Sequence, residues 1–209
     1  MFLVSESLAI DQNFAVLKQL PGRGSSVQYA DAPNYSSMLK KIPYIELYEE
    51  QAADRLYNFR MIDGALVQMS YEFNGRQQLV RHRLAYWPSP LLLQFQESPE
   101  TYLEGEIYGD VVDYREIVVP IRFDYDNRDG VAKDMDHPVS HLTLGRYKHC
   151  RIASTSAISP YLFMEFLLRG FYNTPDDYVS KRLPVKLDSW PSSITAAERQ
   201  RIHVGVPCS

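Results

Sequence analysis

The chain has 209 residues, of which 45% are hydrophobic and 23% are charged, and its formal net charge is −4. This apolar content excludes a mainly disordered chain, because disordered segments lack the side chains that a core needs. The length suits a single globular domain. The lack of a basic excess argues against a general binder of duplex nucleic acid, which neutralises phosphates with lysine and arginine.

The sequence carries no signal for membrane insertion or secretion. No window approaches the roughly 18 uncharged apolar residues of a spanning helix, and the first residues lack the basic stretch and cleavage site of a signal peptide. The two cysteines, Cys150 and Cys208, form neither a disulfide framework nor a zinc-binding set. We therefore expect a reduced, soluble, cytoplasmic protein with no membrane partner.

The first 62 residues predict a mostly helical segment. Residues 6–20 carry apolar side chains at helical spacing until a Pro-Gly pair ends the run, and residues 44–62 keep the same period. The stretch between them, residues 21–43, mixes turn-forming residues with scattered apolar ones and predicts a loop.

The clearest local signal is a β-hairpin. Apolar and polar residues alternate from 67 to 73, and Asn74-Gly75 then supplies the two central residues of a type I′ turn. A two-residue turn pairs Val67 with His82, which places His82 on the apolar face of the hairpin.

Further strands are predicted in the middle of the chain. Four segments have the alternation or the short apolar run of a strand, namely residues 91–96, 115–126, 140–145 and 150–153. The last two are expected to form a hairpin. Pro120 cannot donate a backbone hydrogen bond, so its strand is predicted at an edge of the sheet or with a bulge.

Two helix starts are predicted towards the end of the chain. Ser159 followed by Pro160 has the pattern of an N-cap and a first helical residue. The helix after it has an apolar stripe that includes Phe166, which we expect in the core. Thr195 and Glu198 have the spacing of a capping box.

The order of these elements predicts an α+β fold. We expect a single domain over residues 1–209, with a largely antiparallel sheet of four to six strands packed against N- and C-terminal helices. The domain divides into a mostly helical part (1–62), a β-rich core (63–153) and C-terminal helices with a tail (154–209).

Polar residues suited to catalysis gather in the second half of the chain. Strand alternation puts Arg122, Asp124 and Asp126 on one face of their strand. It also puts His141 and Thr143 together on one face of the next strand. Antiparallel pairing of the two strands would bring all of these side chains together.

Such a set suits general acid–base cleavage of a phosphodiester without a cofactor. Imidazole titrates near physiological pH, a neighbouring carboxylate orients it, and a guanidinium group holds a phosphate by paired hydrogen bonds. The predicted catalytic residues are His141, His137, Asp124 and Arg122, and the predicted substrate-binding residues are Arg151, Thr143 and Asp126.

The same residues also have an ordinary structural explanation. Asp124 can form an ion pair with Arg122 or Arg151, and aspartate, asparagine and glycine are common in turns between strands. His137 and His141 have a spacing that suits a metal on a helix, whereas the pattern here is that of a strand. The sequence has no nucleotide-binding glycine motif and no nucleophile elbow, so neither a metal nor a cofactor is predicted.

One stretch of the sequence resembles a known family. Its motifs are PIRFDYD at 120–126, HPVSHLTLG at 137–145, CRI at 150–152 and FLLRGFY at 166–172. Together with the strand that ends in Tyr86-Trp87-Pro88, they make residues 86–172 similar to a bacterial family called domain of unknown function 2290. The Arg-Phe-Asp stretch and the His-Pro and Ser-His pairs after it are also similar to small toxins of the TumE type.

The resemblance implies a bacterial protein from a defence-associated or mobile locus, and it brings no established activity. Two functions follow. The first is an effector that processes nucleic acid, in the manner of an RNase or phosphodiesterase, with the histidine–aspartate set. The second is a non-catalytic interaction subunit or scaffold of a defence or toxin–antitoxin complex. A protein of the same locus is the expected partner, nucleic acid is a further candidate, and the oligomeric state stays open.

Overall fold

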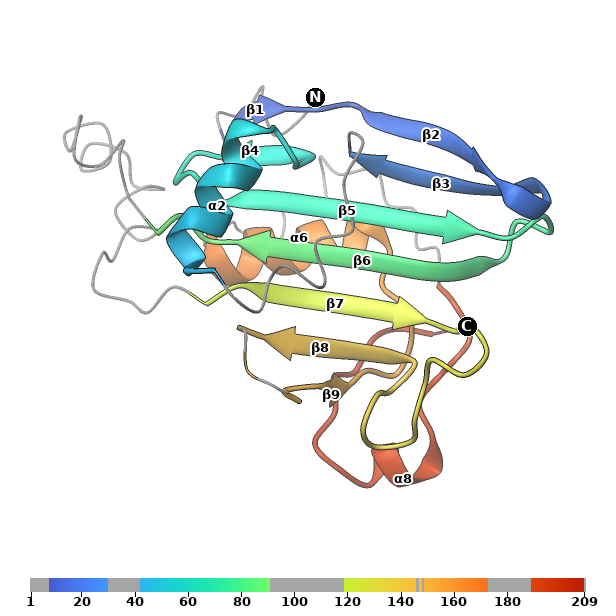
Figure 1. Cartoon of the computed structure of the whole chain (residues 1–209). Coiled ribbons are helices and arrows are strands. Elements are labelled where there is room, and N and C mark those ends of the chain that lie inside the picture. Colours follow the sequence, from blue (N-terminus) through green and yellow to red (C-terminus); the bar gives the residue numbers. More distant parts are fainter. Residues whose placement is uncertain are drawn as a thin grey trace.

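A large antiparallel sheet organises the chain in the computed structural model (Figure 1), which describes residues 8–29, 42–90, 119–145, 147, 149–172 and 189–208. Its nine strands are β1 (Ala9–Gln12), β2 (Ala15–Leu20), β3 (Gly24–Tyr29), β4 (Phe59–Met61), β5 (Leu66–Phe73), β6 (Leu79–Trp87), β7 (Ile121–Asp126), β8 (Ser140–Leu144) and β9 (Ile152–Ala153). The described helices are α2 (Tyr44–Ala53), α6 (Pro160–Phe171), α8 (Ala196–Arg199) and the short 3₁₀ helix η1 (Pro21–Arg23).

The strands follow the order β1-β4-β5-β6-β7-β8-β9, and the β2–β3 hairpin joins the sheet where β3 pairs with β5. β5 therefore has two neighbours on one side, β4 near its start and β3 near its end. The predicted fold class, a single α+β domain with a largely antiparallel sheet, is confirmed. The four to six strands that we expected are too few for this nine-stranded sheet.

The helix predicted over residues 6–20 is wrong, because the described part of this segment forms β1 and β2. The apolar residues that suggested a helix are exposed, with Phe14 at 79% and Leu17 at 65%. Among the described strands β2 pairs only with β3, and most of its side chains are exposed, so it lacks the alternation of a half-buried strand. α2 confirms a helix in the second predicted segment, but it ends at Ala53 and β4 follows, so the described residues of 1–62 are not mostly helical.

The β5–β6 hairpin exists, but its turn is longer than the predicted two residues. Gly75, Arg76 and Gln77 form the loop, in which Gln77 takes the left-handed conformation with φ of 59°. The Asn74 side chain accepts hydrogen bonds from the backbone N–H groups of Arg76 and Gln78. Because Asn74 satisfies these amides, the wider turn competes successfully with the type I′ turn.

The wider turn and a β-bulge or irregularity between Glu72 and Phe73 together shift the register of the hairpin. Val67 pairs with Tyr86 instead of His82, and His82 pairs with Tyr71. The shift is an even number of residues, so His82 keeps the predicted apolar face, where it is only 1% exposed.

β7 lies inside the sheet, which contradicts the edge position or bulge predicted from Pro120. It pairs with β6 on one side and with β8 on the other. Pro120 lies just before β7, where no N–H is needed for the ladder, and its carbonyl oxygen accepts a hydrogen bond from Gly145 N–H at 2.7 Å. The predicted hairpin of β8 and β9 is confirmed. The strand predicted at 91–96, and residues 115–118 of the next one, lie outside the described residues.

Both predicted helix starts are confirmed. The Ser159 side chain accepts a hydrogen bond from Leu162 N–H, and Pro160 begins α6. Thr195 and Glu198 form the capping box of α8.

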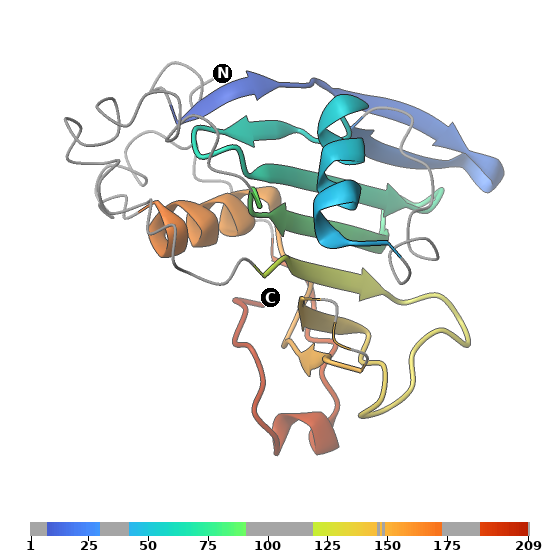
Figure 2. The ribbon, with the colours of Figure 1, turned by 60° about the vertical axis from the view of Figure 1, so that its left-hand side comes forward.

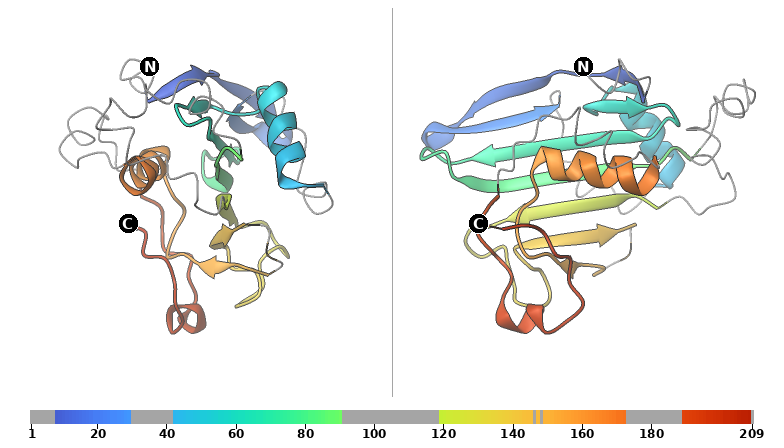
Figure 3. Two further views of the ribbon diagram at one scale, coloured as in Figure 1. Left: turned by 90° about the vertical axis from the view of Figure 1, so that its left-hand side faces the viewer. Right: turned by 180° about the vertical axis from the view of Figure 1, so that it is seen from behind.

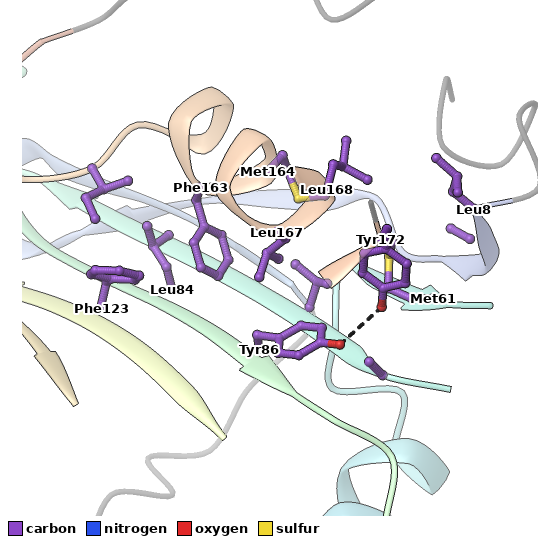
Figure 4. Close-up of a cluster of buried hydrophobic side chains, with 14 of the residues drawn as sticks. Leu8, Met61, Leu84, Tyr86, Phe123, Phe163, Met164, Leu167, Leu168 and Tyr172 are labelled. Carbon is purple, nitrogen blue, oxygen red and sulfur yellow. Dashed lines mark hydrogen bonds between the residues drawn. The ribbon is translucent and has the colours of Figure 1, made fainter. Parts of the chain in front are cut away.

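α6 packs on one face of the sheet and completes the main core (Figure 4). Its buried residues are Phe163, Met164, Leu167 and Leu168. Phe166 is 40% exposed, so the prediction that it lies in the core is wrong. Positions 163, 164, 167 and 168 share one stripe of a helix, whereas position 166 lies on its flank, where the Phe166 ring meets the Phe123 ring edge-on at 5.6 Å.

α2 covers one end of the opposite face of the sheet (Figure 2; Figure 3, left). Leu47 and Tyr48 of α2 pack against Leu66, Ala85 and Trp87 in a second, smaller cluster. Next to this cluster, β6, β7 and β8 carry charged and titratable side chains on the same face, which we call the polar face.

The position of the buried stripe of α6 predicts that two phenylalanine-to-alanine substitutions lower the free energy of unfolding by different amounts. Phe163 is fully buried, so Phe163→Ala should lower the free energy of unfolding by about 3–5 kcal/mol. Phe166→Ala should cost about 1–2 kcal/mol, because that ring is partly in solvent and contributes mainly its aromatic contacts. Urea unfolding of the two variants checks the order, and an equal or reversed cost would contradict this placement of α6.

Candidate functional site

A row of residues crosses the polar face on neighbouring strands. Arg83 on β6 pairs with Asp124 on β7, and Asp124 pairs with His141 on β8. Directly paired residues of antiparallel strands share a face, so these side chains lie side by side on the face opposite α6. Two residues further along, Arg122 pairs with Thr143 on the same face. We call these five residues the polar row.

Asp124 is the centre of the polar row. Its carboxylate accepts a hydrogen bond from Arg83 Nε at 3.0 Å on one oxygen and from Arg122 Nε at 2.5 Å on the other. Burial raises the pKa of the Asp124 carboxyl, but the charges of Arg122 and Arg83, and that of His141 when it is protonated, outweigh this effect and lower the pKa to about 2. Asp124 is therefore ionised at neutral pH.

His141 is held in one orientation and is almost completely buried, with 2% of it exposed. Its Nδ1 lies 2.8 Å from the carbonyl oxygen of Pro138, which only accepts hydrogen bonds, so Nδ1 carries the proton. Its Nε2 lies 3.7 Å from a carboxylate oxygen of Asp124. Burial lowers the pKa of His141 to about 4, and the opposing effect of Asp124 is smaller. At neutral pH the ring is thus uncharged, with its lone pair on Nε2.

His137 lies beside His141, in the connection between β7 and β8. Its Nδ1 donates to the carbonyl oxygen of Val131 at 2.8 Å, and the centroids of the two imidazole rings are 5.1 Å apart. The structure thus brings the four predicted catalytic residues into one cluster, and the cluster lies at the predicted pairing of two strands.

The predicted substrate-binding residues have different surroundings. Thr143 belongs to the polar row, and its Oγ1 is buried without a hydrogen-bond partner. Asp126 belongs to a separate network, in which it forms an ion pair with Arg128 at 2.6 Å. Arg151 reaches the backbone carbonyl oxygen of Asp136 at 3.4 Å. Thr143 is therefore the one of the three that lies within the polar row.

Sequence reasoning missed Arg83 as a member of the site. In the sequence Arg81 and Arg83 alternate with His82, a pattern typical of the solvated side of a strand. The pairing of Arg83 with Asp124 depends on the register between β6 and β7, which are separated by more than thirty residues in the chain. No local pattern specifies that register.

His82 occupies the opposite face of the sheet and has a structural role. Its Nε2 accepts a hydrogen bond from Ile158 N–H at 3.0 Å, and its ring lies between those of Tyr71 and Tyr125. Burial lowers the pKa of His82 to about 4, so the ring is neutral in the folded protein at pH 7. His82 therefore ties the segment before α6 to the sheet.

Asp63 is a second, largely buried carboxyl that the sequence did not single out. It accepts hydrogen bonds from Ala65 N–H at 3.0 Å and from the Tyr172 hydroxyl at 2.9 Å, and the Tyr86 hydroxyl lies 3.4 Å away. Burial raises its pKa. Figure 4 shows the Tyr86–Tyr172 pair, which joins the end of α6 to β6. This cluster fixes the C-terminal end of α6 on the sheet.

Two further features bear on function. Within the described ranges, no three histidine, cysteine, aspartate or glutamate side chains gather as a metal-binding group. In the same ranges, no helix is long and apolar enough to cross a membrane.

Comparison with known families places the chain. The model of the DUF2290 family, described as an uncharacterized conserved protein, matches residues 8–206. The chain belongs to this family. The match includes every residue of the polar row, whereas the comparisons give no support for the likeness to TumE-type toxins. Searches of curated proteins and of solved structures found no significant match.

The two buried histidines predict a loss of stability in acid. Both have a folded-state pKa of about 4, below the ordinary value of about 6.5, so from pH 6.5 towards pH 4 the unfolded chain binds protons that the folded chain does not. Each histidine should cost about 2 kcal/mol of stability at pH 5.

Urea unfolding of the wild type and of His141→Gln at pH 7.5 and pH 5 measures this effect. The variant should lose about half as much stability between the two pH values as the wild type. The difference in the free energy of unfolding between the wild type and His141→Gln at pH 7.5 measures the contacts of His141, because the ring is largely unprotonated in both the folded and the unfolded state at that pH. An unchanged pH dependence in the variant would show that His141 is protonated in the folded protein.

Proposed function

We propose that the chain acts on nucleic acid as an effector that resembles an RNase or phosphodiesterase, with the polar row and His137 as its active site. The observation that carries the proposal is the orientation of His141. Its Nδ1 is engaged by the Pro138 carbonyl, which leaves Nε2 beside Asp124 and its two arginines. A proton-accepting nitrogen beside paired guanidinium groups is what general-base cleavage of a phosphodiester needs.

In the proposed reaction, Arg83 and Arg122 hold a phosphate of the substrate. His141 Nε2 removes the proton of the attacking hydroxyl, from water or a ribose, as the new O–P bond forms. Asp124, 3.7 Å from Nε2, stabilises the resulting imidazolium. The P–O bond to the leaving group then breaks as the proton on His141 Nε2 passes by way of His137 Nε2 to the leaving oxygen, which returns both rings to their neutral forms. These steps use protein groups alone.

We also propose that the chain works with a second protein of the same locus, in bacterial defence or in a toxin–antitoxin pair. The resemblance of residues 86–172 to a bacterial family with such loci supports this partner. The acidic net charge of −4 favours a protein partner over non-specific binding of nucleic acid.

Cleavage of labelled single-stranded RNA and DNA by the purified chain, in the presence of EDTA, tests the catalytic proposal. His141→Gln should lower the rate at least about 100-fold, because it removes the general base while it keeps most of the side-chain volume. Arg128→Gln is the matched control, since Arg128 lies near the same face and pairs with Asp126 outside the polar row. It should cleave like the wild type.

The melting temperature of both variants is measured beside the rate. An inactive wild type, or a His141→Gln variant with the wild-type rate, would overturn the catalytic proposal. The catalytic proposal would also be overturned if the cleavage rate of His141→Gln fell only as far as its folded fraction fell. His141 would then stabilise the fold and take no part in the reaction.

The burial of His141 favours a second function, that of a non-catalytic interaction subunit. β2 is an outer strand of the described sheet, on which Val16 and Leu17 are exposed at 42% and 65%, and Phe14 just before it is exposed at 79%. Apolar side chains on an outer strand are typical of strands that pair with another chain. If the chain is such a subunit, Leu17→Asp should abolish binding of the protein encoded beside it without a change in melting temperature, and no cleavage should be found.

A further inference from the structure

The two arginines of the polar row use only part of their hydrogen-bonding capacity. Each donates its Nε–H to Asp124, and within the described residues neither Nη group of Arg83 or Arg122 has a partner. A guanidinium group has five N–H donors, so four remain on each side chain. Each side chain is 25% exposed, which leaves these donors open to a ligand.

Thr143 is an independent sign of a missing acceptor. It lies opposite Arg122 on the polar face, it is 9% exposed, and its Oγ1 has no hydrogen-bond partner. Buried hydroxyl groups nearly always have a partner in folded proteins, because an unsatisfied one costs free energy. An oxyanion bound between the arginines would supply that acceptor.

The charge of the site selects among anions. Asp124 offsets one of the two guanidinium charges, and the neutral ring of His141 adds none. Arg83, Arg122, Asp124 and His141 together therefore carry one positive charge in excess. A ligand with one negative charge makes the assembly neutral, whereas a second negative charge would remain uncompensated beside an Asp124 side chain that is only 13% exposed.

We infer that Arg83, Arg122 and Thr143 form a binding site for a singly charged phosphodiester, with Arg83 as the second arm of a two-arginine clamp. This inference rests on the proposed function and narrows it: the ligand is an internal phosphate of a nucleic acid strand, not a terminal phosphomonoester. Asp124 acts on the ligand through the arginines, because it holds both guanidinium groups in position by their Nε atoms.

Dimethyl phosphate and methyl phosphate are probes of similar size that differ in charge at pH 7.5. Titration of each into ¹⁵N-labelled protein, followed through the arginine side-chain NMR signals, measures binding without any reaction. Dimethyl phosphate should shift the signals of Arg83 and Arg122 and saturate. Methyl phosphate should bind no more tightly than dimethyl phosphate.

Substitutions then identify the groups that bind. Arg83→Lys should weaken binding of dimethyl phosphate at least about 10-fold, because an ammonium group cannot keep one donor on Asp124 and offer a planar pair to the ligand. Thr143→Val should weaken binding of dimethyl phosphate about 3-fold, whereas Thr143→Ser, which keeps the hydroxyl group, should bind it like the wild type. Arg128→Lys is the control and should bind like the wild type.

The results separate this inference from the proposed function. Binding without any cleavage would support the clamp and overturn the catalytic proposal. Cleavage that is unaffected in Arg83→Lys would overturn the clamp, and with it the phosphate-holding role of Arg83 in the proposed reaction, while the role of His141 as the general base would stand. Tighter binding of methyl phosphate would overturn the assignment to a phosphodiester, and unshifted arginine signals with both probes would overturn the clamp itself.

Discussion

The buried carboxylate of Asp124 is the constraint on which the polar face depends. An ionised group among packed strands is stable only if opposite charges and hydrogen bonds replace the water that it loses. Arg83 from β6 and Arg122 from β7 provide both, one on each carboxylate oxygen. The requirement links the register of β6 to that of β7, because a slip by one residue would turn Arg83 to the apolar face. Electrostatics and strand pairing are therefore coupled at the centre of the sheet.

The same pairing explains why two buried histidines have different environments. His82 and His141 lie on opposite faces, and burial lowers the pKa of each to about 4. His82 accepts a backbone hydrogen bond on Nε2 and packs between aromatic rings, as a structural residue does. His141 donates through Nδ1 to the Pro138 carbonyl, and its Nε2 faces a carboxylate. The difference in Nε2 surroundings, rather than the burial, makes His141 the candidate for proton transfer.

Local patterns predicted the elements that depend on nearby residues. The caps of α6 and α8 are made within four residues of their helix starts, and the alternation in β7 and β8 follows from strand geometry alone. The helix predicted over 6–20 failed because β1 and β2 form through pairing with β4 and β3, and the exposed side chains of β2 carry no periodic signal. The turn after Asn74 differed because the Asn74 side chain accepts hydrogen bonds from the N–H groups of Arg76 and Gln78 and so stabilises a wider turn.

The sequence by itself determined the α+β class, the faces of β7 and β8, and thus the meeting of Asp124 with His141. These follow from alternation and from a connection short enough to pair two strands. Only the tertiary structure decided that β7 is an inner strand, that Arg83 joins Asp124, and that Phe166 lies outside the core. Each of these depends on the register or rotation of elements far apart in the chain. Their relative positions come from the packing of the whole sheet and from the balance of buried charge, which no local pattern contains.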